Sequence, residues 1–299
     1  GIIQFIKQKS IGLSFLRESL IGPDIPGVAK IILNGHKYIR SYGLFPHPNI
    51  LGGFLIVSIV FTLLYLRLFH VEQSKSSQGK QPFIKAILLI QIFGLFLTFS
   101  KSAILGLIIG LVYIYRKLIV PRGTIQDSRI KKLFHVEQLR ILMPATLILL
   151  VSLFFIFKPN LNSFFIQPLD ERVLYLNVSR GTILANPILG LGAGQFIIQM
   201  QNFSPIVLQS WQYQPVHNIF LLIWSELGLV GVFFFIWILK LTTYPKIPLD
   251  ITDRQSGDVP RGTIYLKAAL LGLIFISLFD HYLWSIQQGE ILLWIILGL

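Results

Sequence analysis

Long apolar stretches constrain the fold of this chain more than any other feature. Seven of them consist almost entirely of hydrophobic residues, at 50–69, 83–100, 102–119, 140–157, 219–242, 264–284 and 287–299. A helix needs about 20 apolar residues to cross a hydrocarbon core of about 30 Å, and most of these stretches approach that length. With 54% hydrophobic and only 13% charged residues, the composition is also far from that of a soluble domain. The sequence therefore predicts an all-α integral membrane protein, a helical bundle of about seven spans.

A long segment of mixed polarity, residues 158–218, separates the fourth apolar stretch from the fifth. We expect it to form one large periplasmic loop. The chain then divides into an extracytoplasmic N-terminal segment (1–48), four spans (49–157), the loop (158–218) and three C-terminal spans (219–299), the last one incomplete. Because the sequence begins with Gly1 and ends within an apolar stretch, we expect it to be part of a longer protein.

Basic residues indicate which way the predicted bundle faces. Lys and Arg cluster after the first, third and fifth apolar stretches, which is a single side of the membrane if the spans alternate. The positive-inside rule makes that side cytoplasmic, so the turn at Lys101 and the long loop face outward. A net charge of +13 would suggest a nucleic-acid partner for a soluble protein. Here the charges set topology and attract anionic membrane lipid, so we expect no nucleic-acid partner.

Two pentapeptides each occur twice, one at 69–73 and 134–138 and the other at 120–124 and 259–263. The first contains His and Glu, but the spacing H-x-E is unspecific and all copies lie at span ends or in basic loops, so we predict no metal site. The DNA palindrome GTTCCACGTGGAAC encodes both pentapeptides, in different reading frames. We interpret the copies as traces of one DNA element that resembles the centromere-like site of bacterial partition systems. Synonymous codons that break the palindrome would contradict this interpretation.

Two candidate clusters lie beside the early spans. The first contains Arg40, His47 and Asn49. Two prolines and Asn49 are typical of a turn and helix cap, whereas Arg40 and His47 require water or an anionic partner. The second is Ser100-Lys101-Ser102, which we place at a hairpin turn because a lysine at mid-bilayer costs roughly 2.5–3.5 kcal/mol. Lys101 either extends to lipid headgroups or, beside two hydroxyls and a helix start, binds a phosphate.

Two further clusters lie in the long loop. Arg172 follows two acidic residues, so it forms either an ordinary surface ion pair or part of a ligand site. The alternating glycines at 190–194 lack the strand, the helix and the spacing of a dinucleotide fingerprint, and they suggest close backbone packing or a turn beside a ligand. His217-Asn218 begins the apolar stretch that carries Glu226, and a histidine there is either a polar cap or a base.

The four clusters together predict one chemistry. Arg40, Lys101 and Arg172 all fall on the predicted outer face. Clustered cations suit a diphosphate, because they neutralise the charge that grows on it as a bond breaks. His217 lies on the same face, and a neutral histidine can accept a proton from an incoming hydroxyl.

Several short motifs carry a family resemblance. The first two are Arg40-x-x-Gly43-x-Phe45-Pro46-His47-Pro48-Asn49 and Phe99-Ser100-Lys101-Ser102-Ala103. The others are Arg172 upstream of Pro187-x-x-Gly190-x-Gly192, and His217-Asn218 followed by Glu226-x-Gly228. In order and spacing over nearly the whole chain, these motifs resemble the O-antigen ligase and O-antigen polymerase superfamily of bacterial membrane glycosyltransferases, which includes protein O-oligosaccharyltransferases. One departure is Lys101, where the family commonly has Arg, because lysine lacks the bidentate fork of a guanidinium.

The resemblance implies a multi-pass enzyme of the bacterial cytoplasmic membrane with its active site on the outer face. It passes a glycan from an undecaprenyl-diphosphate carrier to an acceptor hydroxyl, without a cofactor or an obligatory metal. When the roles of the family's motif residues are transferred to the matching positions of this sequence, the resemblance implies that Arg172, Lys101 and Arg40 bind the diphosphate. It also implies that His217 activates the acceptor. The supporting residues are His47, Asn49, Ser100, Ser102, Asn218 and Glu226. The acceptor stays open among lipid A core, a growing glycan chain, as in the polymerase branch, and a protein hydroxyl.

Two functions of other classes remain as alternatives. A transporter or flippase for the same lipid-linked oligosaccharide needs polar or charged groups near the bilayer midplane, whereas these spans are nearly uncharged away from their ends. A scaffold of an envelope assembly predicts no effect of single Arg or His substitutions. Transfer by the purified protein, supplied with lipid, donor and acceptor, separates the three functions.

Overall fold

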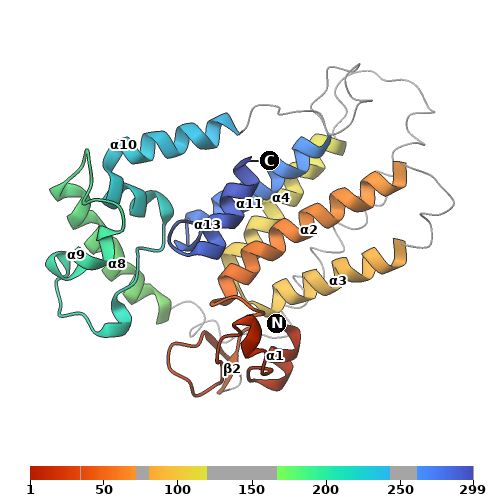
Figure 1. Cartoon of the computed structure of the whole chain (residues 1–299), viewed down its shortest axis with the longest axis horizontal. Helices are drawn as coiled ribbons and strands as arrows, with labels where there is room; N and C mark the ends of the chain where they lie inside the picture. The colour runs from red at the N-terminus through yellow and green to blue at the C-terminus, as the bar shows by residue number, and fades with distance from the viewer. Residues whose placement is uncertain (34, 72–80, 120–166, 243–260, 299) are drawn as a thin grey trace.

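A computed structural model describes residues 1–33, 35–71, 81–119, 167–242 and 261–298 (Figure 1). The predicted span at 140–157 and the repeat copies at 120–124 and 134–138 lie outside these residues.

Most of the predicted apolar stretches coincide with described helices. These are α2 (Pro48–Val71), α3 (Gln81–Leu97), α4 (Lys101–Ile119), α10 (Ile219–Leu241), α11 (Arg261–Ser277) and α13 (Gln287–Gly298). Within the described residues, two helical segments are long and apolar enough to cross a membrane, Pro48–Arg67 and Ile219–Leu241, and the apolar parts of α3 and α11 are shorter. The predicted helical class is confirmed, and the number of seven spans stays a prediction.

Helices α2, α3, α4, α11 and α13 form one bundle (Figure 1). Glycines bring α4 and α11 into backbone contact. A Cβ added at Gly106 would lie 2.8 Å from the carbonyl oxygen of Gly272, and one at Gly110 would lie 2.8 Å from that of Ala268. Small residues at such a seam allow close packing of helices that lipid alone would not drive together.

The N-terminal segment forms a small unit against one end of the bundle (Figure 1). It contains helix α1 (Ile2–Lys7), the 3-10 turn η1 (Ser14–Leu16) and a hairpin of β1 (Lys30–Leu33) and β2 (His36–Ile39). The hairpin was not predicted. The backbone N–H of Ser41 donates to the carbonyl of Leu97 over 2.9 Å, so this segment is fixed where α3 ends.

The described part of the long loop is mostly helical. It contains α8 (Gln167–Ala185), α9 (Gln195–Phe203) and the 3-10 turn η3 (Ser210–Gln212), which lie to one side of the bundle (Figure 1). Their apolar faces form a core of their own together with the start of α10, made of Tyr175, Val178, Phe196, Met200, Leu208, Val216 and Leu222. From Gln167 onward the loop is therefore a packed unit built on α10.

Helix α10 is interrupted at Gly228, whose backbone angles are φ 68° and ψ −169°. The chain at 187–192 packs into the interruption. Leu191 and Gly192 donate to the carbonyls of Ser225 and Glu226, over 2.9 and 2.8 Å, and Leu229 donates to that of Pro187 over 3.0 Å. The glycines of the Pro187-x-x-Gly190-x-Gly192 motif thus serve close backbone packing, one of the two interpretations given above.

The predicted stretch 264–284 is not one helix. Helix α11 ends at Ser277, a turn follows, and the short helix α12 (Tyr282–Ser285) precedes α13. Leu278 and Phe279 continue the apolar pattern but lie in the turn, about 42% exposed. The prediction was wrong at this end because hydropathy does not register where a helix stops.

Candidate active site

A partly buried chain of polar contacts starts from Arg40, just before α2. Its Nε donates to the carbonyl of Thr98 and its Nη2 donates to Oδ1 of Asn49, each over 2.6 Å. Asn49 in turn donates from Nδ2 to Oδ2 of Asp280, also over 2.6 Å. Burial lowers the pKa of Arg40 to about 10, against the opposing effects of Tyr42 and Asp280, so the guanidinium stays charged at neutral pH. The chain joins the end of α3, the start of α2 and the turn after α11.

Asp280 was not among the predicted site residues. It is 6% exposed, and its Oδ1 accepts a hydrogen bond of 2.8 Å from the backbone N–H of His281. Burial alone would raise the pKa of Asp280, but the neighbouring His281, His217 and His47, together with the hydrogen bond from Asn49, lower it. A sequence signal existed, because Asp280 is the one acidic residue in the apolar stretch 264–284.

His217 lies between two other rings. Tyr175 of α8 stacks on it with ring centroids 5.6 Å apart and an interplanar angle of 14°. His281 meets it edge to face, at 5.2 Å and 87°. The next residue, Asn218, caps α10 by accepting from the N–H of Leu221 over 3.1 Å. The structure therefore gives the two residues separate tasks, with Asn218 as the helix cap and His217 in the polar cluster.

Both histidines of the predicted site are neutral at physiological pH. Burial lowers the pKa of His217 to about 4, with His281 and Arg172 acting in the same direction and Asp280 opposing. Burial also lowers the pKa of His47 to about 4, reinforced by the charge of Arg40. A neutral imidazole can accept a proton, so both rings are in the form that a base requires.

Cations from three separate segments act on one another, and Arg172 and Arg40 also act on His217 and His47, respectively. Lys101 is the first residue of α4, after a tight turn in which Phe99 has a φ of 49°. The positive charges of Arg172 and Arg40 lie close enough to act on Lys101. Ser100 is buried, and its Oγ lies 3.5 Å from that of Ser102. All three predicted diphosphate ligands therefore lie at the same end of the bundle.

Glu226 has a different place from the other predicted residues. It is 8% exposed inside α10, and its Oε1 accepts from the backbone N–H of Phe196 over 3.4 Å. Gly194 and Trp284 also donate to this carboxylate. Glu226 thus fastens the start of α9 to α10 and α12, next to the Gly228 interruption.

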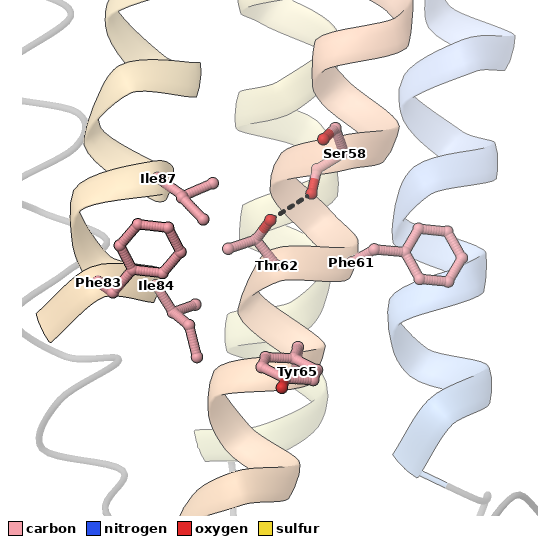
Figure 2. Close-up of a pocket in the computed structure, with 7 residues that line it drawn as sticks. All are labelled: Ser58, Phe61, Thr62, Tyr65, Phe83, Ile84 and Ile87. Atoms are coloured by element: carbon pink, nitrogen blue, oxygen red, sulfur yellow. Dashed lines mark hydrogen bonds between the residues drawn. The ribbon is translucent and has the colours of Figure 1, made fainter. Parts of the chain in front are cut away.

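No group of His, Asp and Glu in the described part of the chain has the arrangement of a metal site. One cavity of about 730 Å³ lies between α2 and α3, away from the cations (Figure 2). Its lining is apolar apart from hydroxyls, and consists of Ser58, Phe61, Thr62, Tyr65, Phe83, Ile84 and Ile87. Without a charged group it does not suit a diphosphate, so the candidate site is the polar cluster at the end of the bundle.

A family model described as O-antigen ligase matches residues 86–236. The match includes Lys101, Arg172 and His217, whereas Arg40, Asn49 and Asp280 lie outside it. No curated protein and no solved structure matches the chain. The family match supports a membrane enzyme of the ligase or glycosyltransferase type. Since it covers half of the sequence, the chain belongs to the O-antigen ligase family.

Proposed function

We propose that this protein transfers a glycan from an undecaprenyl-diphosphate carrier to an acceptor hydroxyl on the outer face of the cytoplasmic membrane. The observation that carries the proposal is the meeting of three cations with a neutral histidine. Arg172, Lys101 and Arg40 come from three separate segments. The charges of Arg172 and Arg40 act on Lys101, and the charge of Arg172 also acts on His217. Like charges repel, so such a cluster favours an anionic partner with several charges, as a diphosphate has.

The proposed reaction is a displacement at the anomeric carbon. The acceptor oxygen forms a bond to this carbon while the bond from the carbon to the diphosphate oxygen breaks. The bonding electron pair leaves with the diphosphate, and His217 takes the hydroxyl proton. Arg172 and Lys101 stabilise the charge that develops on the leaving group.

Arg40 has a supporting role in this scheme. Two of its nitrogens already donate to Thr98 and Asn49, so its guanidinium is held in place by the protein itself. Its charge nevertheless acts on Lys101 and on His47. We assign it to holding the turn before α2 and adding positive potential, with Asn49 and Asp280 fixing its position.

The location of the charges favours transfer over transport. A flippase requires polar or charged groups along a path near the bilayer midplane. Here the cations and histidines gather where α3 and α11 end and where α2, α4 and α10 begin. A reaction at one surface fits this arrangement.

Transfer of a labelled glycan by purified protein in lipid nanodiscs tests the proposal. We expect Arg172→Ala to lower kcat/KM by about 10²–10³-fold, as loss of one transition-state donor does. His217→Ala should lower kcat about 10²–10⁴-fold. Arg180→Ala on the exposed side of α8 and His36→Ala on β2 are matched controls that should transfer normally. Near-normal transfer by both Arg172→Ala and His217→Ala would overturn the assignment.

A further inference from the structure

The ring of Tyr175 stacks on the imidazole of His217. The two rings are nearly parallel, with an interplanar angle of 14°, and His281 closes another side of the imidazole at 87°. An imidazole on a solvated chain rotates among rotamers, whereas contact with two rings of fixed orientation leaves it little freedom. The plane of His217 is therefore set by residues of α8 and of the turn after α11.

The hydroxyl of Tyr175 does not explain why a tyrosine is placed here. It is buried and has no hydrogen-bond partner among the described residues. An unpaired buried hydroxyl costs stability rather than adding to it. The contribution of this side chain thus lies in its ring.

Helix α8 is firmly held where it carries this ring. Tyr175 is 1% exposed in the core that α8 shares with α9 and α10. One turn further along, the hydroxyl of Ser179 lies 3.0 Å from that of Ser225 on α10. Arg172 precedes Tyr175 by three residues, so both lie on the same face of α8. A single rigid helix therefore bears the cation expected to bind the leaving group and the ring that orients the base.

The stack also determines which nitrogen of His217 is available. Nδ1 is buried and has no hydrogen-bond partner in the described structure, so Nε2 is the nitrogen that an acceptor can reach. We propose that Tyr175 is a positioning residue, whose ring fixes the imidazole of His217 so that Nε2 faces the acceptor hydroxyl. The inference rests on the proposed function and adds the residue that orients its base.

Charged and titratable groups face His217 from every element around it. They are Glu171 and Arg172 on α8, Asp280 and His281 after α11, and His47 before α2. None of them changes in a Tyr175 variant. Loss of the ring admits water to one face of the imidazole, and because burial is the largest cause of the low pKa of His217, that pKa should rise toward its ordinary value. Tyr175→Phe retains the ring and should leave it unchanged.

The experiment compares Tyr175→Leu with Tyr175→Phe in nanodiscs. Tyr175→Leu should lower kcat by about 10–100-fold, the size of effect that a small misplacement of a reacting group produces, and change the donor KM by less than about threefold. The acid limb of its pH–rate profile should move upward. Tyr175→Phe should keep wild-type kcat and pH profile. The titration of His217, followed by NMR of histidine-labelled protein, gives a readout that does not require activity.

Phe196→Leu is the matched control, since it removes a fully buried ring from the same core that is not one of the two rings packed on His217. It should lower stability without altering the titration of His217. If Tyr175→Leu does not fold, Tyr175→Met fills a similar volume without a ring and replaces it. Equal losses in Tyr175→Leu and Phe196→Leu, unchanged kcat in Tyr175→Leu, or an equal loss in Tyr175→Phe would each refute the inference. Absence of His217-dependent transfer in the wild type refutes the proposed function instead, and the NMR titration still tests the stack.

Discussion

Asn49 donates a hydrogen bond of 2.6 Å to Asp280 and so ties the start of α2 to the turn after α11. The same amide accepts from Arg40, and the carboxylate lies among His47, His217 and His281. One carboxylate therefore balances a buried guanidinium and offsets the loss of solvation around the histidines. Buried charges are tolerated when they are paired and hydrogen-bonded in this way.

Asp280→Ala should be strongly destabilising. It leaves Arg40 buried without its counter-charge and Asn49 without an acceptor. Leaving a buried donor unsatisfied costs about 1–3 kcal/mol, and the lost attraction between the carboxylate and Arg40 adds to this cost. Asp280→Asn keeps an acceptor for Asn49 and should cost less. Thermal unfolding in detergent measures the difference. Asp24→Asn is the control, because this carboxyl is exposed and should unfold as the wild type does. Equal melting temperatures for Asp280→Ala and wild type would contradict the expectation.

Lys101→Arg should preserve transfer or improve it. A guanidinium keeps the positive charge and adds a bidentate fork suited to phosphate oxygens. Lys101→Ala should lower kcat/KM by about 10²–10³-fold if Lys101 stabilises the leaving group. Transfer assays on both variants distinguish a lysine that binds the diphosphate from one that only contacts lipid headgroups. Lys240→Ala, at the far end of α10, is the matched control. Equal transfer by Lys101→Ala and the wild type would exclude the ligand role.

The activity should persist into acid. Transfer requires neutral His217, and the pKa of this histidine is lowered by burial to about 4, below its ordinary value. As pH falls from 7, the base stays neutral until the pH nears that value, and only then is it protonated and lost. We expect kcat/KM to be flat down to about pH 5 and to decline below it, since kcat/KM reports the groups of the free enzyme. A decline centred near pH 6.5 would show that His217 is more solvated than the structure indicates.

Gly228→Ala should disrupt the junction between α8 and α10. Its φ of 68° with ψ near 180° is a backbone conformation that a residue with a Cβ rarely adopts, and the added Cβ would meet the carbonyl oxygen of Ile188. The strain alone costs about 1–3 kcal/mol. Gly94→Ala in α3 is the control, because its Cβ meets only Leu55 at 3.6 Å. Proteolysis of the loop in each variant measures the effect, and equal cleavage rates would argue against it.

The sequence predicted the helical bundle because long apolar stretches leave a chain few other ways to satisfy its backbone. It also predicted the members of the cation cluster, since Arg40, Lys101 and Arg172 stand at the ends of such stretches or in the loop. That these three residues lie near one another could be learned only from the three-dimensional fold. The charge of Arg172 acts on Lys101 only because α8 packs against α10, and hydropathy carries no information on that packing.

Three features were missed for separate physical reasons. Asp280 follows Leu278 and Phe279, so hydropathy predicts that this turn belongs to a membrane span. Tyr175 lies in a segment of mixed polarity that was predicted as a loop, although Arg172, Tyr175 and Ser179 recur at helical spacing. The hairpin of β1 and β2 did carry a local signal, because the dipeptide Asn34-Gly35 is typical of a two-residue hairpin turn.

The glycine contact between α4 and α11 has a consequence for the cell. Where Gly106 and Gly110 bring the two backbones together, no file of water fits between them. Water therefore has no path between α4 and α11 from the polar cluster at one end of these helices to their other end. On the proposed location, the protein handles a charged carrier lipid without giving protons a route through this seam, and the ion gradients that power the cell are kept.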